Sequence, residues 1–106
     1  MQLNLGSPAP DMDQPLPKFR RDLETYPGPD DIDGSPTFKV FDPIKTQFFR
    51  VTWAEATIMR LMKPNITINQ LLKRINHKTS LRVTAEELIY FFEDAGKNGL
   101  TEKPRS

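Results

Sequence analysis

The second half of the chain, "VTWAEATIMRLMKPNITINQLLKRINHKTSLRVTAEELIYFFEDAGKNGL" (Val51–Leu100), contains one short pattern three times. In each copy a threonine precedes a Glu or Gln by three residues, which is the spacing of a helix-capping box. The copies are Thr52–Glu55, Thr67–Gln70 and Thr84–Glu87. An apolar residue stands before each threonine, where it can pack against the first turn of a helix. The pattern therefore predicts three helices that begin at these threonines.

Apolar residues follow each start at the spacing of one helix face. The three stripes are Ala54, Ile58, Leu61 and Met62, then Ile68, Leu71, Leu72 and Ile75, then Ala85, Leu88, Phe92 and Ala95. Pro64 separates the first two helices. Gly96 or Gly99 ends the third, and Leu100 is placed to fold back onto it.

The first half contains three segments typical of strands, which are "KFRRDLET" (Lys18–Thr25), "TFKVF" (Thr37–Phe41) and "TQFFRV" (Thr46–Val51). Asp42 and Pro43 suit a type I turn, so the last two segments are expected to form a tight hairpin. A long acidic connection, Glu24–Pro36, precedes this hairpin. The predicted fold is α+β and winged-helix-like, with a three-stranded antiparallel sheet followed by three helices (β-β-β-α-α-α). Four phenylalanines lie in the hairpin strands, so either both faces of the sheet are covered or one is left exposed.

Length and composition predict one small domain. The chain has 106 residues, 37% of them hydrophobic, with a net charge of +1 and no cysteine. The segment "SPAPDMDQPLP" has no apolar periodicity, so residues 1–17 are expected to form a disordered tail. The domain is expected to span residues 18–101, with a second disordered tail at 102–106. No run is long and apolar enough for a membrane span or a signal core, which predicts a soluble chain without disulfides.

The sequence offers no catalytic constellation. His77 is the single histidine, and with no cysteine beside it a metal or nucleophilic site has too few ligands. The acidic residues Asp30, Asp31 and Asp33 lack the spacing of a calcium loop and are expected to favour turns. The prediction is an isolated domain that is not an enzyme and has no metal site or cofactor.

Charge argues against DNA binding by the third helix. This helix carries Glu86, Glu87, Glu93 and Asp94 against Lys97 alone, which opposes docking on phosphates. A basic group lies elsewhere, at Lys73, Arg74, Lys78 and Arg82. It is interpreted first as a solvated face, with contact to anionic lipid or an acidic peptide as the alternative.

On a helical wheel the apolar arc of the third helix runs from Phe91 round to Ile89, which is wider than a core-facing stripe requires. One rim of this arc, predicted at Ile89 with Tyr90 beside it, is expected to stay uncovered. An open apolar rim beside a strand edge is what addition of a peptide strand requires.

The segment Leu16–Trp53 resembles the N-terminal region of the peptide zinc metalloproteases, bacterial membrane proteins similar to site-2 proteases. The residues that carry the resemblance are Leu16, Pro17, Arg20, Asp22, Leu23, Pro27, Gly28, Gly34, Ser35, Pro36, Phe38, Asp42, Pro43, Phe48 and Phe49. The long acidic connection is part of this pattern, and the chain departs from it at Phe19, where the family has Leu. The helices that follow resemble the PqqD-like domain, so the resemblance covers about residues 16–101.

The resemblance implies a non-catalytic domain that holds a leader or substrate peptide between the third strand and the third helix. The peptide-binding residues expected from it are Gln47, Phe48, Phe49, Arg50, Val51, Glu86, Ile89, Tyr90 and Glu93. Family members continue into transmembrane helices with a zinc site, so the chain is expected to be an excised domain or a stand-alone relative. Its expected place is the cytoplasm, at the inner face of the cell membrane through a parent peptidase or an export partner. The alternative is a structural or regulatory domain that docks through the Phe-rich hairpin.

Overall fold

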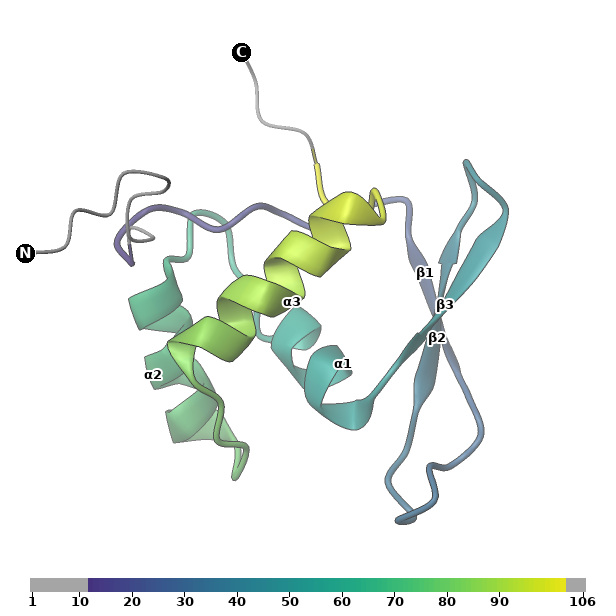
Figure 1. Cartoon of the computed structure of the whole chain (residues 1–106), viewed down its shortest axis with the longest axis horizontal. Coiled ribbons are helices and arrows are strands. Elements are labelled where there is room, and N and C mark those ends of the chain that lie inside the picture. Colours follow the sequence, from purple (N-terminus) through teal and green to yellow (C-terminus); the bar gives the residue numbers. More distant parts are fainter. Residues whose placement is uncertain (1–11, 103–106) are drawn as a thin grey trace, which may run out of the picture.

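The computed structural model describes residues 12–102 (Figure 1). Its elements are β1 (Glu24–Pro27), β2 (Phe38–Asp42), β3 (Gln47–Val51), α1 (Trp53–Arg60), α2 (Ile68–Lys78) and α3 (Ala85–Lys97). The strands form one antiparallel sheet in the order β1-β2-β3. The predicted succession of three strands and three helices is confirmed.

All three helices begin at the predicted threonines. Thr52, Thr67 and Thr84 each accept a hydrogen bond from the backbone N–H three residues on, and the Glu or Gln at that position accepts one from the threonine's own N–H. Each capping box satisfies two N–H groups that a helix start otherwise leaves unpaired. The helix starts therefore follow from local chemistry.

The end of α3 resolves the choice between two glycines. Gly96 lies within the helix, whereas Gly99 follows it with φ +73°, a conformation that favours glycine. The N–H of Gly99 donates to the carbonyl of Gly96, and the N–H of Leu100 donates to the carbonyl of Ala95. These two bonds form a Schellman motif, and Leu100 is buried against the helix as predicted.

The hydrophobic core lies among the helices. Leu71, Ile75 and Leu88 have no exposed surface, and they pack with the predicted stripe residues Ile58 and Phe92. In Figure 1 the three helices lie together on one side of the sheet, and no described segment crosses the opposite side. We call the sheet face toward the helices the inner face and the opposite one the outer face.

The pairing register assigns the side chains of the hairpin to these two faces. Val40 pairs with Phe49 and Phe38 with Val51 on the inner face, where Val40 and Val51 are buried. Phe41 pairs with Phe48 on the outer face, and their ring centroids lie 4.7 Å apart. The predicted hairpin is confirmed, and of the two expectations for its phenylalanines the exposed face is the one observed.

The first strand begins later than predicted. The prediction was Lys18–Thr25, but β1 spans Glu24–Pro27, so most of the predicted segment lies outside the sheet. Phe19 forms an isolated bridge with Thr101, and its ring packs against Phe92 of α3. Residues 18–20 thus lie along residues 100–102, just after α3, where the N–H of Arg20 donates to the carbonyl of Leu100 and the N–H of Glu102 donates to the carbonyl of Lys18.

Part of the predicted N-terminal tail is also ordered. The N–H of Leu16 donates to the carbonyl of Ile66 at 2.8 Å, and the N–H of Asn69 donates to the carbonyl of Met12 at 3.3 Å. Met12 and Leu16 pack on the hydrophobic core. Residues 12–17 therefore lie along the start of α2, because two apolar side chains in this Pro-rich segment find core contacts. Glu102, predicted as the first residue of the C-terminal tail, donates its N–H to the carbonyl of Lys18 at 2.7 Å. The rest of the predicted tails, residues 1–11 and 103–106, lies outside the described part.

The long acidic connection is shorter than predicted because β1 occupies its first four residues. The remaining loop is closed by Gly28, whose N–H donates to the carbonyl of Thr37 at 2.9 Å. Asp33 accepts the N–H of Ser35, and this bond is the main cause that lowers the pKa of the Asp33 carboxyl. Asp31 forms an ion pair with Arg50 of β3 at 3.3 Å. The acidic residues thus organise turns and tie the loop to the sheet.

Candidate functional site

The hydrogen-bond pattern of the sheet shows which backbone N–H and C=O groups point outward at its two edges. In an antiparallel pair, residues that exchange backbone hydrogen bonds alternate with residues that do not. The bond from Gly28 to Thr37 starts this alternation, so every second residue of β2 from Thr37 onward faces β1. The residues between them face β3, and Val40 and its partner Phe49 therefore exchange backbone bonds.

The edge of β3 is open. Phe48 and Arg50, on either side of Phe49, direct their N–H and C=O groups away from β2 by this alternation. Within residues 12–102 no other strand pairs with β3, and no hydrogen bond reaches these outward groups. β3 therefore presents two donors and two acceptors to an incoming extended chain.

The edge of β1 is less suited to pairing. The same alternation directs the backbone of Thr25 and Pro27 outward, and proline has no N–H to donate. Proline at an edge is a common way in which proteins block unwanted strand addition. The two edges thus differ, and β3 is the one that can accept another strand.

A groove runs from the inner side of β3 along α3. Beside β3 there is a narrow hollow of about 80 Å³, and a wider one of about 450 Å³ continues between α1 and α3. Both are lined by Glu55, Phe91 and Asp94, so they adjoin. We call the two together the α3 groove; its main residues are Phe49, Arg50, Val51, Ala54, Glu55, Glu86, Glu87, Tyr90, Phe91 and Asp94.

The α3 groove includes part of the residue set expected from the sequence. Phe49, Arg50 and Val51 line its β3 end, and Glu86 and Tyr90 line its α3 end. Gln47 and Phe48 are exposed, Gln47 at the start of β3 and Phe48 on the outer face.

Two expected residues point elsewhere. Ile89 is half-buried against the core, and Glu93 lines a different hollow, beside the N-terminal residues Pro15 and Leu16. The expectation placed the open rim of α3 at Ile89, but the structure has Phe91 facing β3. Phe91 was the other end of the same apolar arc on the helical wheel, so the pattern contained the residue without showing which end faced the sheet.

The α3 groove combines aromatic surface with uncompensated carboxylates. Tyr90 is 72% exposed, and Phe91 is half-buried beside it. Four acidic residues line the groove, namely Glu55, Glu86, Glu87 and Asp94. Among residues 12–102 none of them forms an ion pair. Arg50, the one cation among the lining residues, has its side chain on the outer face by the pairing register and is paired with Asp31. The groove is therefore apolar along its floor and negative along its rim.

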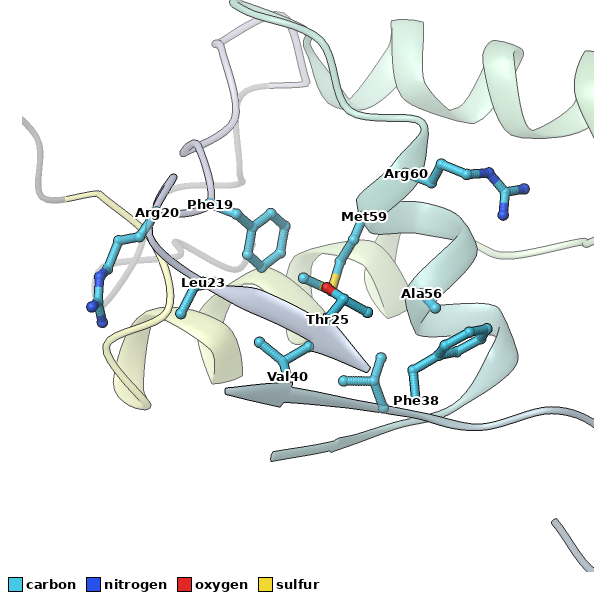
Figure 2. A pocket seen from close by; sticks show the side chains of 10 residues that line it. Phe19, Arg20, Leu23, Thr25, Phe38, Val40, Ala56, Met59 and Arg60 are labelled. Atoms are coloured by element: carbon cyan, nitrogen blue, oxygen red, sulfur yellow. The ribbon is translucent and has the colours of Figure 1, made fainter. Parts of the chain in front are cut away.

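A second hollow also lies on the inner face of the sheet, toward the β1 edge, between β1, β2 and α1 (Figure 2). Its volume is about 390 Å³, and its walls are mainly apolar. Figure 2 shows Phe19 and Met59 beside this space, while Arg20 and Arg60 extend away from it. Val40, Val51 and Met59 line both this hollow and the narrow one at β3, so the inner face of the sheet is only partly covered by helices.

Arg20 connects three parts of the chain next to this hollow. Its guanidinium donates two hydrogen bonds to Asp42, at 2.8 and 2.9 Å, and one to the carbonyl of Gly99 at 2.9 Å. Asp22 accepts two more. The hydrogen bonds from Arg20 are the main cause that lowers the pKa of Asp42 from 3.8 to about 2, with smaller help from the N–H groups of Lys45 and Ile44. Both Arg20 and Asp42 belong to the residues that carry the family resemblance.

The basic group of the sequence analysis is partly assembled, away from the α3 groove. Lys73, Arg74 and Lys78 line an open hollow on α2 together with Lys63 and His77. Arg74 also donates to the carbonyl of Leu61 at 2.8 Å, which caps the end of α1. Arg82 is instead hydrogen-bonded to nearby backbone carbonyls after α2.

Two further features of residues 12–102 bear on the possible chemistry. They contain no group of three or more potential metal-binding side chains close enough to hold an ion. In the same range no helix has the length and apolar character that crossing a lipid bilayer requires.

No protein-family model matches the chain, and no curated protein or solved structure matches it significantly.

Proposed function

We propose that this chain is a non-catalytic peptide-recognition domain. An extended leader or substrate peptide adds to β3 as a further strand and lies against the α3 groove. The observation that carries the proposal is the open edge of β3, with the free backbone groups of Phe48 and Arg50 directly beside an apolar groove. In strand addition, backbone hydrogen bonds supply affinity and adjacent pockets supply sequence preference.

The resemblance to the PqqD-like domain supports the same function and suggests its setting. In this proposal the domain acts in the cytoplasm, at the inner face of the cell membrane, within a membrane zinc peptidase or a peptide-export system. Fractionation of the native cells tests the setting: the chain should co-sediment with membranes through its parent or partner. Recovery only in the fraction without membranes would contradict it.

The direct test of peptide recognition is an amide NMR titration of the isotope-labelled chain with leader and substrate peptides encoded near its gene. The expected result is a set of shifts confined to Gln47–Val51 and to the α3 residues Tyr90, Phe91 and Asp94. Shifts confined to β1, or no shift from any peptide at high concentration, would contradict strand addition at β3.

A second candidate function is supported by the outer face of the sheet. Phe48 is 61% exposed and Tyr26 44% exposed on this face, and the ring of Phe41 packs against that of Phe48 at a tilt. Clustered exposed aromatic residues are typical of protein–protein contacts. In this alternative the chain is a structural or regulatory domain that docks on its parent protein or on an export partner.

The oligomeric state separates the two candidates. A docking surface of this kind should make the isolated chain self-associate as its concentration rises, and Phe48→Gln should abolish the association. A peptide reader should remain a monomer in sedimentation velocity at all concentrations tested.

A further inference from the structure

The charge of the α3 groove specifies which peptides it can accept, provided that the proposed function holds. We propose that the groove selects extended peptides with lysine or arginine at alternate positions and apolar residues between them. The proposal rests on the geometry of an added strand and on the position of the carboxylates relative to the open edge.

An added strand presents its side chains alternately to the two sides of the sheet. Every second side chain of a peptide on β3 therefore points to the inner side, where Phe91 and Asp94 line the groove. The side chains between them point to the outer side, where Phe48 exposes its ring. The inner side of the peptide thus meets acidic and aromatic groups. Its outer side meets the ring of Phe48 beside the cations of Lys39 and Arg50, which disfavour a second row of cations there.

The inner side suits a long cationic side chain. The alkyl stems of lysine and arginine can pack on apolar surface while their charged ends reach outward. Here the stems would lie on Phe91 and Tyr90, with Asp94 and Glu86 available to the charged ends. A cation over the exposed ring of Tyr90 gains additional attraction from the ring's electron density.

The charges on the remainder of the molecule reinforce this selectivity. Glu55 and Glu87 already accept hydrogen bonds within capping boxes, but Glu86 and Asp94 have no cationic partner among residues 12–102. Lys63, Lys73, Arg74 and Lys78 line the hollow on α2, which lies on the far side of the helices from the sheet (Figure 1). The carboxylates of the groove would therefore repel an acidic peptide, although the net charge of the chain is +1.

The test uses the whole chain and three blocked synthetic peptides in which valine alternates with lysine, glutamine or glutamate. Affinity is measured by fluorescence anisotropy, and the binding site is located by amide NMR. The lysine peptide should bind about fivefold more tightly than the glutamine peptide, because several exposed charge pairs act together. This advantage should decline as salt is added.

Two double variants with equal charge change provide the control. Glu86→Gln with Asp94→Asn removes groove charges and should abolish the preference for the lysine peptide. Glu93→Gln with Glu102→Gln removes two carboxylates beside a different hollow and should leave the preference unchanged. Equal loss in both double variants would overturn the proposal, because it would indicate a general effect of net charge.

The outcomes separate this inference from the proposed function. Equal affinity for all three peptides, with shifts along β3, would overturn the charge selectivity and leave strand addition intact. Tighter binding of the glutamate peptide, with shifts on α2, would overturn the inference and indicate binding at the basic group of Lys73, Arg74 and Lys78 instead. No binding of any peptide, or concentration-dependent shifts along β3 without peptide, would overturn both.

Discussion

At the scale of single residues, the junction around Arg20 and Asp42 holds the structure together. Asp42 is fully buried, and its carboxylate accepts two hydrogen bonds from Arg20 as well as those of Ile44 and Lys45. Arg20 reaches from the N-terminal segment to the hairpin turn and to the end of α3. A buried carboxylate requires such a set of partners, because an unpaired charge in the interior is strongly unfavourable.

Asp42→Asn should lower stability and flatten its dependence on acid pH. The folded pKa of Asp42, about 2, is below the ordinary 3.8, so its contribution is complete above about pH 4 and is lost as pH falls toward 2. Urea unfolding followed by the fluorescence of Trp53 at several pH values measures this. Asp22→Asn is the control, because Asp22 is 40% exposed and should matter less. If the stability of Asp42→Asn depended on pH in parallel with that of the unsubstituted chain, the lowered pKa of Asp42 would be contradicted.

At the scale of elements, local signals account for where the helices start and how α3 ends. Each capping box joins residues three apart, and the Schellman motif joins residues three and five apart. The turn between β2 and β3 is equally local, since Asp42 accepts the N–H groups of residues two and three positions on. These elements depend little on the rest of the molecule.

The two glycines at the end of α3 should respond to alanine in opposite directions. Gly96→Ala should stabilise the protein by roughly 0.5–1 kcal/mol, since glycine is unfavourable within a helix and the new methyl group has ordinary space, 3.7 Å from Thr101 Oγ1. Gly99→Ala should destabilise it by about 1–2 kcal/mol because of the left-handed backbone there. Urea unfolding of both variants tests this, and equal signs would contradict the Schellman assignment.

At the scale of the whole molecule, the sheet is the least covered part. Its outer face carries exposed aromatic rings, its inner face borders two hollows, and one of its edges is open. The helices, by contrast, form a closed core around Leu71 and Leu88. The surfaces available for binding are therefore concentrated on the sheet, while the helical core supplies the stability.

Proline substitution on β3 should have different effects where the backbone N–H points outward and where it bonds to β2. Arg50→Pro removes an outward N–H and leaves the ladder to β2 intact, so the chain should stay folded and lose peptide affinity by about three- to tenfold. Phe49→Pro removes an N–H that bonds to Val40 and should destabilise the fold instead. Circular dichroism and the peptide titration measure both effects.

Arg50→Ala is the matched control, since it also removes the ion pair with Asp31. Equal affinity in Arg50→Pro and Arg50→Ala would show that the outward N–H of this residue takes no part in binding.

The amino-acid sequence by itself determined the order of the elements, the three helix starts, the hairpin and the core stripes, because each depends on residues a few positions apart. Tertiary structure alone decided the position of β1, the packing of residues 12–17 against the core, and which rim of α3 faces β3. The contacts involved join distant residues, such as Arg20 to Asp42, 22 positions apart, and Arg20 to Gly99, 79 positions apart. Local spacing carries no record of such pairings, because their free energy arises only when the chain has brought the partners together.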